Sequence, residues 1–152
     1  MKKYKLIDHT ADAGIEAYGK NLNGLFENAA SGMFAVLCDS AEVKPAKSTA
    51  VRVKAKTLED LMHHWLTELL YRVNKEEILF GKFRVKISGK YSLTGKASGE
   101  KISPVKHHLK TEIKAVTYYQ LEIKRYAIRS LPANFAGRDT RFAYKVRVIF
   151  DV

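Results

Sequence analysis

Apolar and charged residues alternate with a period of two in several segments of this chain. This pattern predicts that much of the chain forms β-sheet. The alternation is plainest in residues 51–54, 83–87, 121–124 and 144–150. Because successive side chains of a strand point to opposite faces, each segment can bury one face and expose the other. We expect turns between these strands at residues 88–90 and around Gly95 and Gly99.

Two further segments have the helical period. Residues 22–37 and 58–73 place apolar side chains at i, i+3, i+4 and i+7, which predicts two amphipathic helices. Asn21 or Asn23 can cap the first helix, and Thr57, three residues before an acidic side chain, provides a capping-box-like start for the second.

The order of these elements predicts an α+β fold in one domain, residues 1–152, with the two helices packed on a mostly antiparallel or mixed sheet. Residues 127–142 are the one long irregular stretch and predict a loop. If the strands share a sheet, its solvent face presents six basic residues, namely Arg52, Lys54, Arg84, Lys86, Lys145 and Arg147.

The composition indicates a basic protein of the cytoplasm. With 27 Lys and Arg against 16 Asp and Glu, the formal net charge is +11, which attracts RNA, DNA or an acidic protein, although a basic surface can also be merely solvated. A single cysteine, Cys38, excludes an intramolecular disulfide, and no secretory leader is recognisable. No apolar run reaches the roughly 20 residues of a membrane helix.

The stretch "DHTADAGIEAYG", residues 8–19, places Asp8, His9 and Asp12 within five positions. Carboxylate oxygens suit a hard cation such as Ca²⁺ or Mg²⁺, yet two aspartates cannot complete such a site. Aspartates are also common turn formers, so the stretch by itself favours an ordinary acidic turn.

The last residues change this interpretation. The strand pattern "YKVRVIFDV" ends with Asp151 beside Val152, so that two carboxylates repel each other unless a cation lies between them. If this strand lies beside the first strands, Asp12, Asp151 and the Val152 carboxylate could converge on one divalent ion. The alternative is a solvated chain end.

Other candidate residues give weaker signals. His63 and His64 lie off the apolar stripe of their helix, and His107 and His108 fall in a polar connection without the spacing of zinc ligands. Lys114 lies in the apolar context "TEIKAVTYYQ", where it either faces a phosphate or extends to the sheet edge. No glycine-rich phosphate loop, nucleophile elbow or kinase-type motif occurs, so the chain is not expected to be an enzyme.

Taken together, these segments resemble one known family. "DHTADAGIEAYG", "LNGLFENAASGMF", "DLMHHWLTELLY", Gly99-Glu100, "EIKAVTY" and "VRVIFDV" occur in the order found in the archease family, from residue 5 to residue 152. The opening HTAD and the closing FDV are the specific parts of this resemblance.

The resemblance implies an accessory activator of the RtcB-type RNA ligase of tRNA splicing and RNA repair. Such a protein promotes guanylation of the ligase, allows it multiple turnovers and can broaden its nucleotide use. It implies a divalent ion, typically Ca²⁺ with Mg²⁺ or Mn²⁺ as alternatives, held by Asp12, Asp151 and Val152. It also implies that Lys114 contacts the ligase or its nucleotide. Asp8 and His9, which lie close to Asp12 in the sequence, would then support the ion site.

Two features depart from the family pattern. Tyr119 occupies the position after "EIKAVTY" where the family usually has histidine, and the 127–142 loop is longer than expected.

One alternative function is a basic RNA-binding module, or a chaperone of RNA-processing proteins, without a metal-dependent role. Another is a metal-dependent phosphoesterase that uses His9 and the aspartates.

Overall fold

The computed structural model describes residues 2–9, 12–129 and 140–152. In chain order the elements are β1 (Tyr4–His9), β2 (Asp12–Gly19), α1 (Leu22–Leu37), η1 (Ser40–Glu42), β3 (Lys47–Lys54), α2 (Leu58–Glu76), β4 (Ile78–Ser88), β5 (Ser92–Lys101), β6 (Ala115–Val116), β7 (Ile123–Arg129) and β8 (Thr140–Asp151). The predicted α+β class is confirmed.

The strands form two separate sheets. A five-stranded sheet has the order β1-β2-β8-β6, with β7 also paired to β8, and a three-stranded sheet has the order β3-β5-β4. Every pairing among the described strands is antiparallel. The six basic residues expected on one sheet face are therefore divided, because Lys145 and Arg147 belong to β8 and the other four to β3 and β4.

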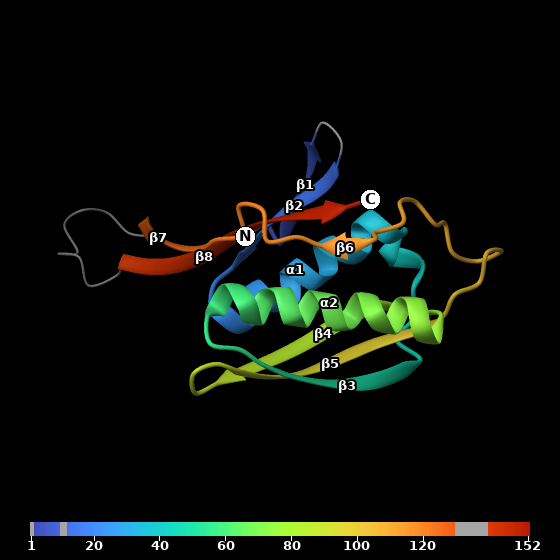
Figure 1. Ribbon diagram of the computed structural model, residues 1–152, viewed down its shortest axis with the longest axis horizontal. Coiled ribbons are helices and arrows are strands. Elements are labelled where there is room, and N and C mark those ends of the chain that lie inside the picture. The colour runs from blue at the N-terminus through green and yellow to red at the C-terminus, as the bar shows by residue number, and fades with distance from the viewer. Residues whose placement is uncertain (1, 10–11, 130–139) are drawn as a thin grey trace.

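The helices form a middle layer between the two sheets (Figure 1). Helix α1 packs against β2 on one side and β4 on the other, and α2 packs against β3, β4, β5 and the short β6. Both predicted caps are present: the side chain of Asn21 accepts from the Gly24 amide at 2.8 Å, and that of Thr57 accepts from the Asp60 amide at 3.1 Å. Each cap satisfies an amide that the first turn leaves unpaired.

The hydrophobic core fills the space around this helical layer. Its largest fully buried side chains come from both helices and both sheets and include Trp65, Phe26, Phe34, Phe80 and Phe150. Burial of these apolar side chains holds the two sheets on opposite sides of the helices. None of the described helices is long and apolar enough to cross a membrane.

The prediction of a loop over residues 127–142 is wrong at both of its ends. Ala127 pairs with Phe142 and Arg129 with Thr140, so both ends of the expected 127–142 loop belong to the β7–β8 ladder. Residues 130–139, the rest of that expected loop, lie outside the described residues. Gly95 and Gly99, expected near turns, both lie inside β5.

Candidate functional site

One end of the five-stranded sheet gathers the residues that the sequence singled out. Ala13 of β2 pairs with Phe150 of β8, so the next residues, Asp12 and Asp151, occupy neighbouring positions at the ends of two paired strands. On the other side of β8, Ala115 pairs with Asp151, and the Lys114 amide donates to the Asp151 carbonyl at 2.7 Å. The structure thus brings together Asp12, Asp151 and Lys114, which are far apart in the sequence.

The strand alternation sets the face on which each of these residues lies. Phe150 is fully buried against the helices, so Asp151 lies on the opposite, outer face, where it is exposed. Asp12 shares that outer face and is partly buried. Val152 instead packs against the core with its partly buried side chain.

The two residues proposed to support the ion site are placed differently. In the β1–β2 ladder His9 pairs with Asp12, whereas Asp8 pairs with Ala13. Because paired residues share a face, the register assigns Asp8, which pairs with Ala13, to the face opposite Asp12. The structure therefore does not bring Asp8 together with Asp12, and the His9 side chain lies outside the described residues.

The aspartates at this end of the sheet offer carboxylate oxygens, which are the type of ligand that a hard cation prefers. Asp12 and Asp151 bring two carboxylates to neighbouring strand ends, and like charges that lie close together repel each other. A divalent ion would relieve this repulsion. Among the described residues no group of three or more His, Cys, Asp or Glu could hold a metal. The two aspartates would therefore need further oxygen ligands, from Val152, water or a partner.

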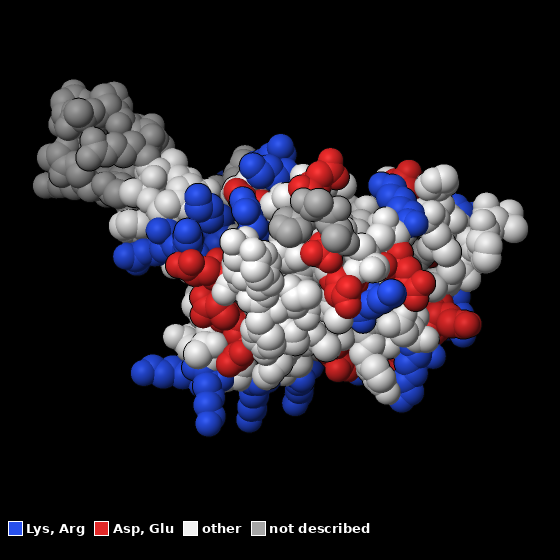
Figure 2. All heavy atoms as spheres, turned by 45° about the horizontal axis from the view of Figure 1, so that its top comes forward, with Lys and Arg blue, Asp and Glu red and all other residues white. Residues whose placement is uncertain are grey.

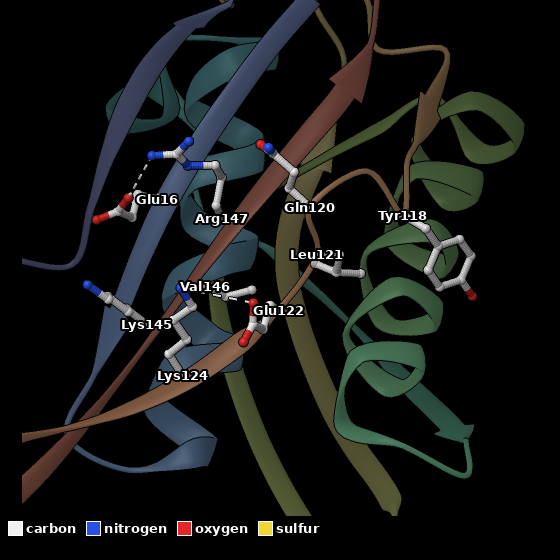
Figure 3. A pocket seen from close by; sticks show the side chains of 9 residues that line it. All are labelled: Glu16, Tyr118, Gln120, Leu121, Glu122, Lys124, Lys145, Val146 and Arg147. Atoms are coloured by element: carbon white, nitrogen blue, oxygen red, sulfur yellow. Dashed lines mark ion pairs between the residues drawn. The ribbon is translucent and has the colours of Figure 1, made fainter.

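A basic hollow lies on the same outer face, nearer the middle of the strands (Figure 3). It has a volume of about 610 Å³ and is lined by Glu16, Tyr118, Gln120, Leu121, Glu122, Lys124, Lys145, Val146 and Arg147. Its three cations outnumber its two carboxylates, and Lys124 lies directly opposite Lys145 across the β7–β8 ladder. This excess of positive charge suits an anionic group.

Glu16 is a carboxylate of this hollow that its neighbours hold in place. Its carboxylate lies 3.6 Å from Arg147 Nη2 and 3.9 Å from Lys5 Nζ, and it accepts a hydrogen bond from the Tyr18 hydroxyl at 2.8 Å. Burial raises the pKa of Glu16, but the Tyr18 hydrogen bond and the nearby cations outweigh it, so the pKa lies below its usual value. Burial, together with the hydrogen bond to Glu16, raises the pKa of Tyr18 to about 12.

Helix α2 holds the segment that carries Lys114 and lines the hollow. His63 Nε2 lies 2.8 Å from the Val116 carbonyl, and its ring stacks on Tyr118 with centroids 3.9 Å apart. Glu59 accepts from the Ile123 amide at 3.0 Å. The sequence pattern places His63 off the apolar stripe of α2, and in the structure its side chain is partly buried. A position off the apolar stripe indicates that the His63 side chain is available for a contact outside the helical core. Its contact with β6 depends on the tertiary arrangement.

The position where the resembling family has histidine lies in the turn after β6. Tyr119 is 56% exposed there, and its amide donates to the Thr117 hydroxyl at 3.3 Å. Lys114 is also exposed, although its neighbours Ile113 and Val116 are buried. An exposed cation beside the Asp151 backbone is available to a partner.

Comparison with known proteins identifies the family of this chain. The family described as the Archease protein family matches residues 4–152. The chain belongs to the archease family. The archease of Sulfurisphaera tokodaii is 44% identical over 125 residues, which are 82% of this chain and 90% of that protein. The archease of Pyrococcus furiosus is 41% identical over 128 residues, covering 82% and 90%.

A solved structure shows the same archease fold. The solution structure of protein 1598 from Methanobacterium thermoautotrophicum aligns over 100% of both chains with a TM-score of 0.78 and 39% identity. The resemblance expected from "DHTADAGIEAYG" and "VRVIFDV" is thereby confirmed.

Proposed function

We propose that this archease-family protein is a cytoplasmic activator of an RtcB-type RNA ligase and not itself an enzyme. It would promote guanylation of the ligase, allow repeated turnover and broaden the nucleotide that the ligase accepts. The observation that carries the proposal is the position of Asp12 and Asp151 at neighbouring ends of β2 and β8, on one face.

The proposed role of this acidic pair is to hold a divalent ion together with Val152. All the side-chain donors are oxygens, which suit Ca²⁺ first, with Mg²⁺ and Mn²⁺ as the alternatives. Two carboxylates and Val152 leave positions for water or for a group of the ligase. Lys114, whose amide is fixed to the Asp151 carbonyl, would contact the ligase or its nucleotide from beside the ion.

The test measures guanylation of limiting ligase with and without this protein. Asp12→Ala should abolish the stimulation, because it removes one of the two neighbouring carboxylates, and Lys114→Ala should weaken it. Asp39→Ala is the matched control, since Asp39 is an exposed aspartate that belongs to neither β2 nor β8. Full stimulation by Asp12→Ala would contradict the ion-dependent role.

The ion site has a second readout that does not involve the ligase. Calorimetric titration with Ca²⁺ should detect binding to the native chain, a loss of at least tenfold in affinity with Asp151→Asn, and no change with Asp39→Ala. Asparagine keeps the shape of the side chain while it removes the charge. Equal affinity of the Asp151→Asn variant and the native chain would contradict Asp151 as a ligand.

A further inference from the structure

The outer face of the three-stranded sheet is a second charged surface, separate from the acidic pair. Val51, Val85, Leu93 and Ala97 face the core from this sheet, so the alternate residues face outward. The outward residues include six cations, which are Arg52, Lys54, Lys82, Arg84, Lys86 and Lys96, and all six are exposed. We call these six residues the basic face. Figure 2 shows Lys and Arg side chains projecting from the lower edge of the molecule, where this sheet lies in Figure 1.

The charge of the basic face is not neutralised within the described part of the chain. None of its six cations forms an ion pair with an acidic residue there, whereas Lys5, Lys106 and Arg147 all do. The register also places two of the cations next to each other, because Arg84 lies directly opposite Lys96. Like charges at opposed positions destabilise a sheet, so an anionic ligand would stabilise this one.

The chemistry of the face favours a phosphate backbone over a protein or a membrane. Its other outward residues are small, namely Ser48, Ala50, Ser88, Ser92, Thr94 and Ser98. The large exposed apolar side chains among the described residues all lie outside these three strands. Protein interfaces depend on aromatic and apolar anchors, and membrane binding needs apolar groups to insert. A face of cations and hydroxyls offers neither.

The arrangement also distinguishes a duplex from a single strand. Proteins that bind single strands stack the bases on aromatic side chains, and the basic face has none. Five of its cations form two outer rows on β3 and β4, about 10 Å apart because the central strand β5 separates them, and Lys96 lies on β5 itself. Between these rows β5 presents the hydroxyls of Ser92 and Thr94. Duplex RNA is recognised across its minor groove through phosphates and 2′-hydroxyls, which this pattern matches.

We infer that the basic face binds the phosphate backbone of duplex RNA without sequence preference. The hydroxyl row supports RNA over DNA, and so does the proposed role in RNA ligation, on which this choice in part rests. The acidic pair and the basic face lie on different sheets, so one molecule could engage a ligase and its RNA substrate with different surfaces.

The test measures binding of the full chain to a labelled RNA duplex of about 16 base pairs, a length that a small domain can span. If the six cations each contact a phosphate, affinity should fall about 10³-fold between about 50 and 200 mM salt. The triple variant Arg52→Gln, Arg84→Gln and Lys96→Gln should halve the slope of log affinity against log salt. Its substitutions are exposed, and circular dichroism verifies that the variant folds.

The matched control carries Lys2→Gln, Lys3→Gln and Lys20→Gln, which remove the same charge from exposed lysines outside the three-stranded sheet. It should retain the slope of the native chain. The inference is overturned if the native chain does not bind the duplex, if both triple variants lose slope equally, or if duplex DNA or single-stranded RNA binds as tightly. Binding only to anionic vesicles or to an acidic protein would also overturn it.

Failure of this inference can be told apart from failure of the proposed function. RNA binding uses this protein alone, whereas the ligase assay scores guanylation without an RNA substrate. Asp12→Ala should lose stimulation and retain RNA binding, and the triple variant of the basic face should show the reverse. Loss of both properties in either variant would contradict two separate surfaces.

Discussion

Glu100 is the centre of a polar cluster that fixes the connection between β5 and β6. Its carboxylate accepts from Lys106 Nζ at 2.8 and 2.9 Å, from the Lys44 amide at 2.9 Å and from His107 Nε2 at 2.9 Å. The other His107 nitrogen, Nδ1, accepts from the Ser103 amide, so the neutral ring carries its proton on Nε2. The buried His107, which the sequence indicated only as part of a polar connection, is therefore a structural residue.

The pKa of Glu100 gives a prediction about pH dependence. The Lys106 hydrogen bonds, followed by those from the Lys44 amide and His107, lower its pKa from 4.5 to about 2. A depressed carboxylate pKa stabilises the fold above pH 4.5, and this stabilisation is lost as the pH falls toward 2. Glu100→Gln cannot titrate, so its free energy of unfolding should fall less steeply over this range than that of the native chain.

Denaturant unfolding at a series of pH values measures this difference. Glu112→Gln is the control, because Glu112 is exposed and makes no hydrogen bond or ion pair within the described residues. It should retain the pH dependence of the native chain. Parallel stability curves for Glu100→Gln and the native chain would contradict the stabilising role of the Glu100 cluster.

At the scale of elements, the first turns of α2 act as a clamp on the segment between β6 and β7. Residues 59, 60 and 63 all reach this segment: Glu59 accepts from the Ile123 amide, Asp60 hydrogen-bonds Tyr118, and His63 contacts both Val116 and Tyr118. Since β6 has only two residues, Ala115–Val116, its own ladder contributes few hydrogen bonds. The clamp therefore supports the short ladder that sets Lys114 beside Asp151.

His63→Ala should loosen β6 without unfolding the protein. The substitution removes the contact with the Val116 carbonyl and the stack on Tyr118, and losing one hydrogen bond costs about 1 kcal/mol. The amides of Lys114 and Thr117, which donate to the carbonyls of Asp151 and Ile149, should exchange hydrogen roughly fivefold faster as a result.

Hydrogen exchange followed by NMR measures these two amides directly. His64→Ala is the matched control from the adjacent position, because the His64 ring lies near the Lys54 carbonyl of β3 and not near β6. It should leave both amides as protected as in the native chain. Unchanged exchange in His63→Ala would show that the β6 ladder is stable without the clamp.

At the scale of the whole molecule, Trp65 joins the helical layer to the three-stranded sheet. Its indole Nε1 donates to the Phe26 carbonyl of α1 at 3.0 Å, and its ring meets Phe83 of β4 edge to face. A Cβ atom at Gly95 of β5 would approach the indole to 2.6 Å. Gly95 is thus explained by this close approach in mid-strand and not by a turn, which is why a local pattern misplaced it.

Gly95→Ala should destabilise the entire fold. The added methyl group forces the fully buried indole to shift, and overpacking of this kind costs about 1 to 3 kcal/mol. Chemical denaturation measures the free energy of unfolding. Thr94→Ala, at the neighbouring outward position, is the control and should change that free energy by less than about 0.5 kcal/mol. A Gly95→Ala variant as stable as the native chain would contradict a tightly packed junction.

The sequence by itself determined the local elements and their faces. Residues 22–37 were predicted as a helix and form α1 with the same bounds, and the alternation around residues 51–54 and 83–87 gave the correct outward side chains. These properties follow from the helical and strand periods, which act over a few neighbouring residues.

Only the tertiary structure decided how the strands divide and which distant residues meet. Strand partners are chosen by packing and hydrogen bonding between segments far apart in the chain, which no local period records. That choice places Arg52 and Arg147 on different sheets, although their patterns are alike. It also pairs β2 with β8 and β6 with β8, and so sets Asp12, Asp151 and Lys114 at one end of one sheet.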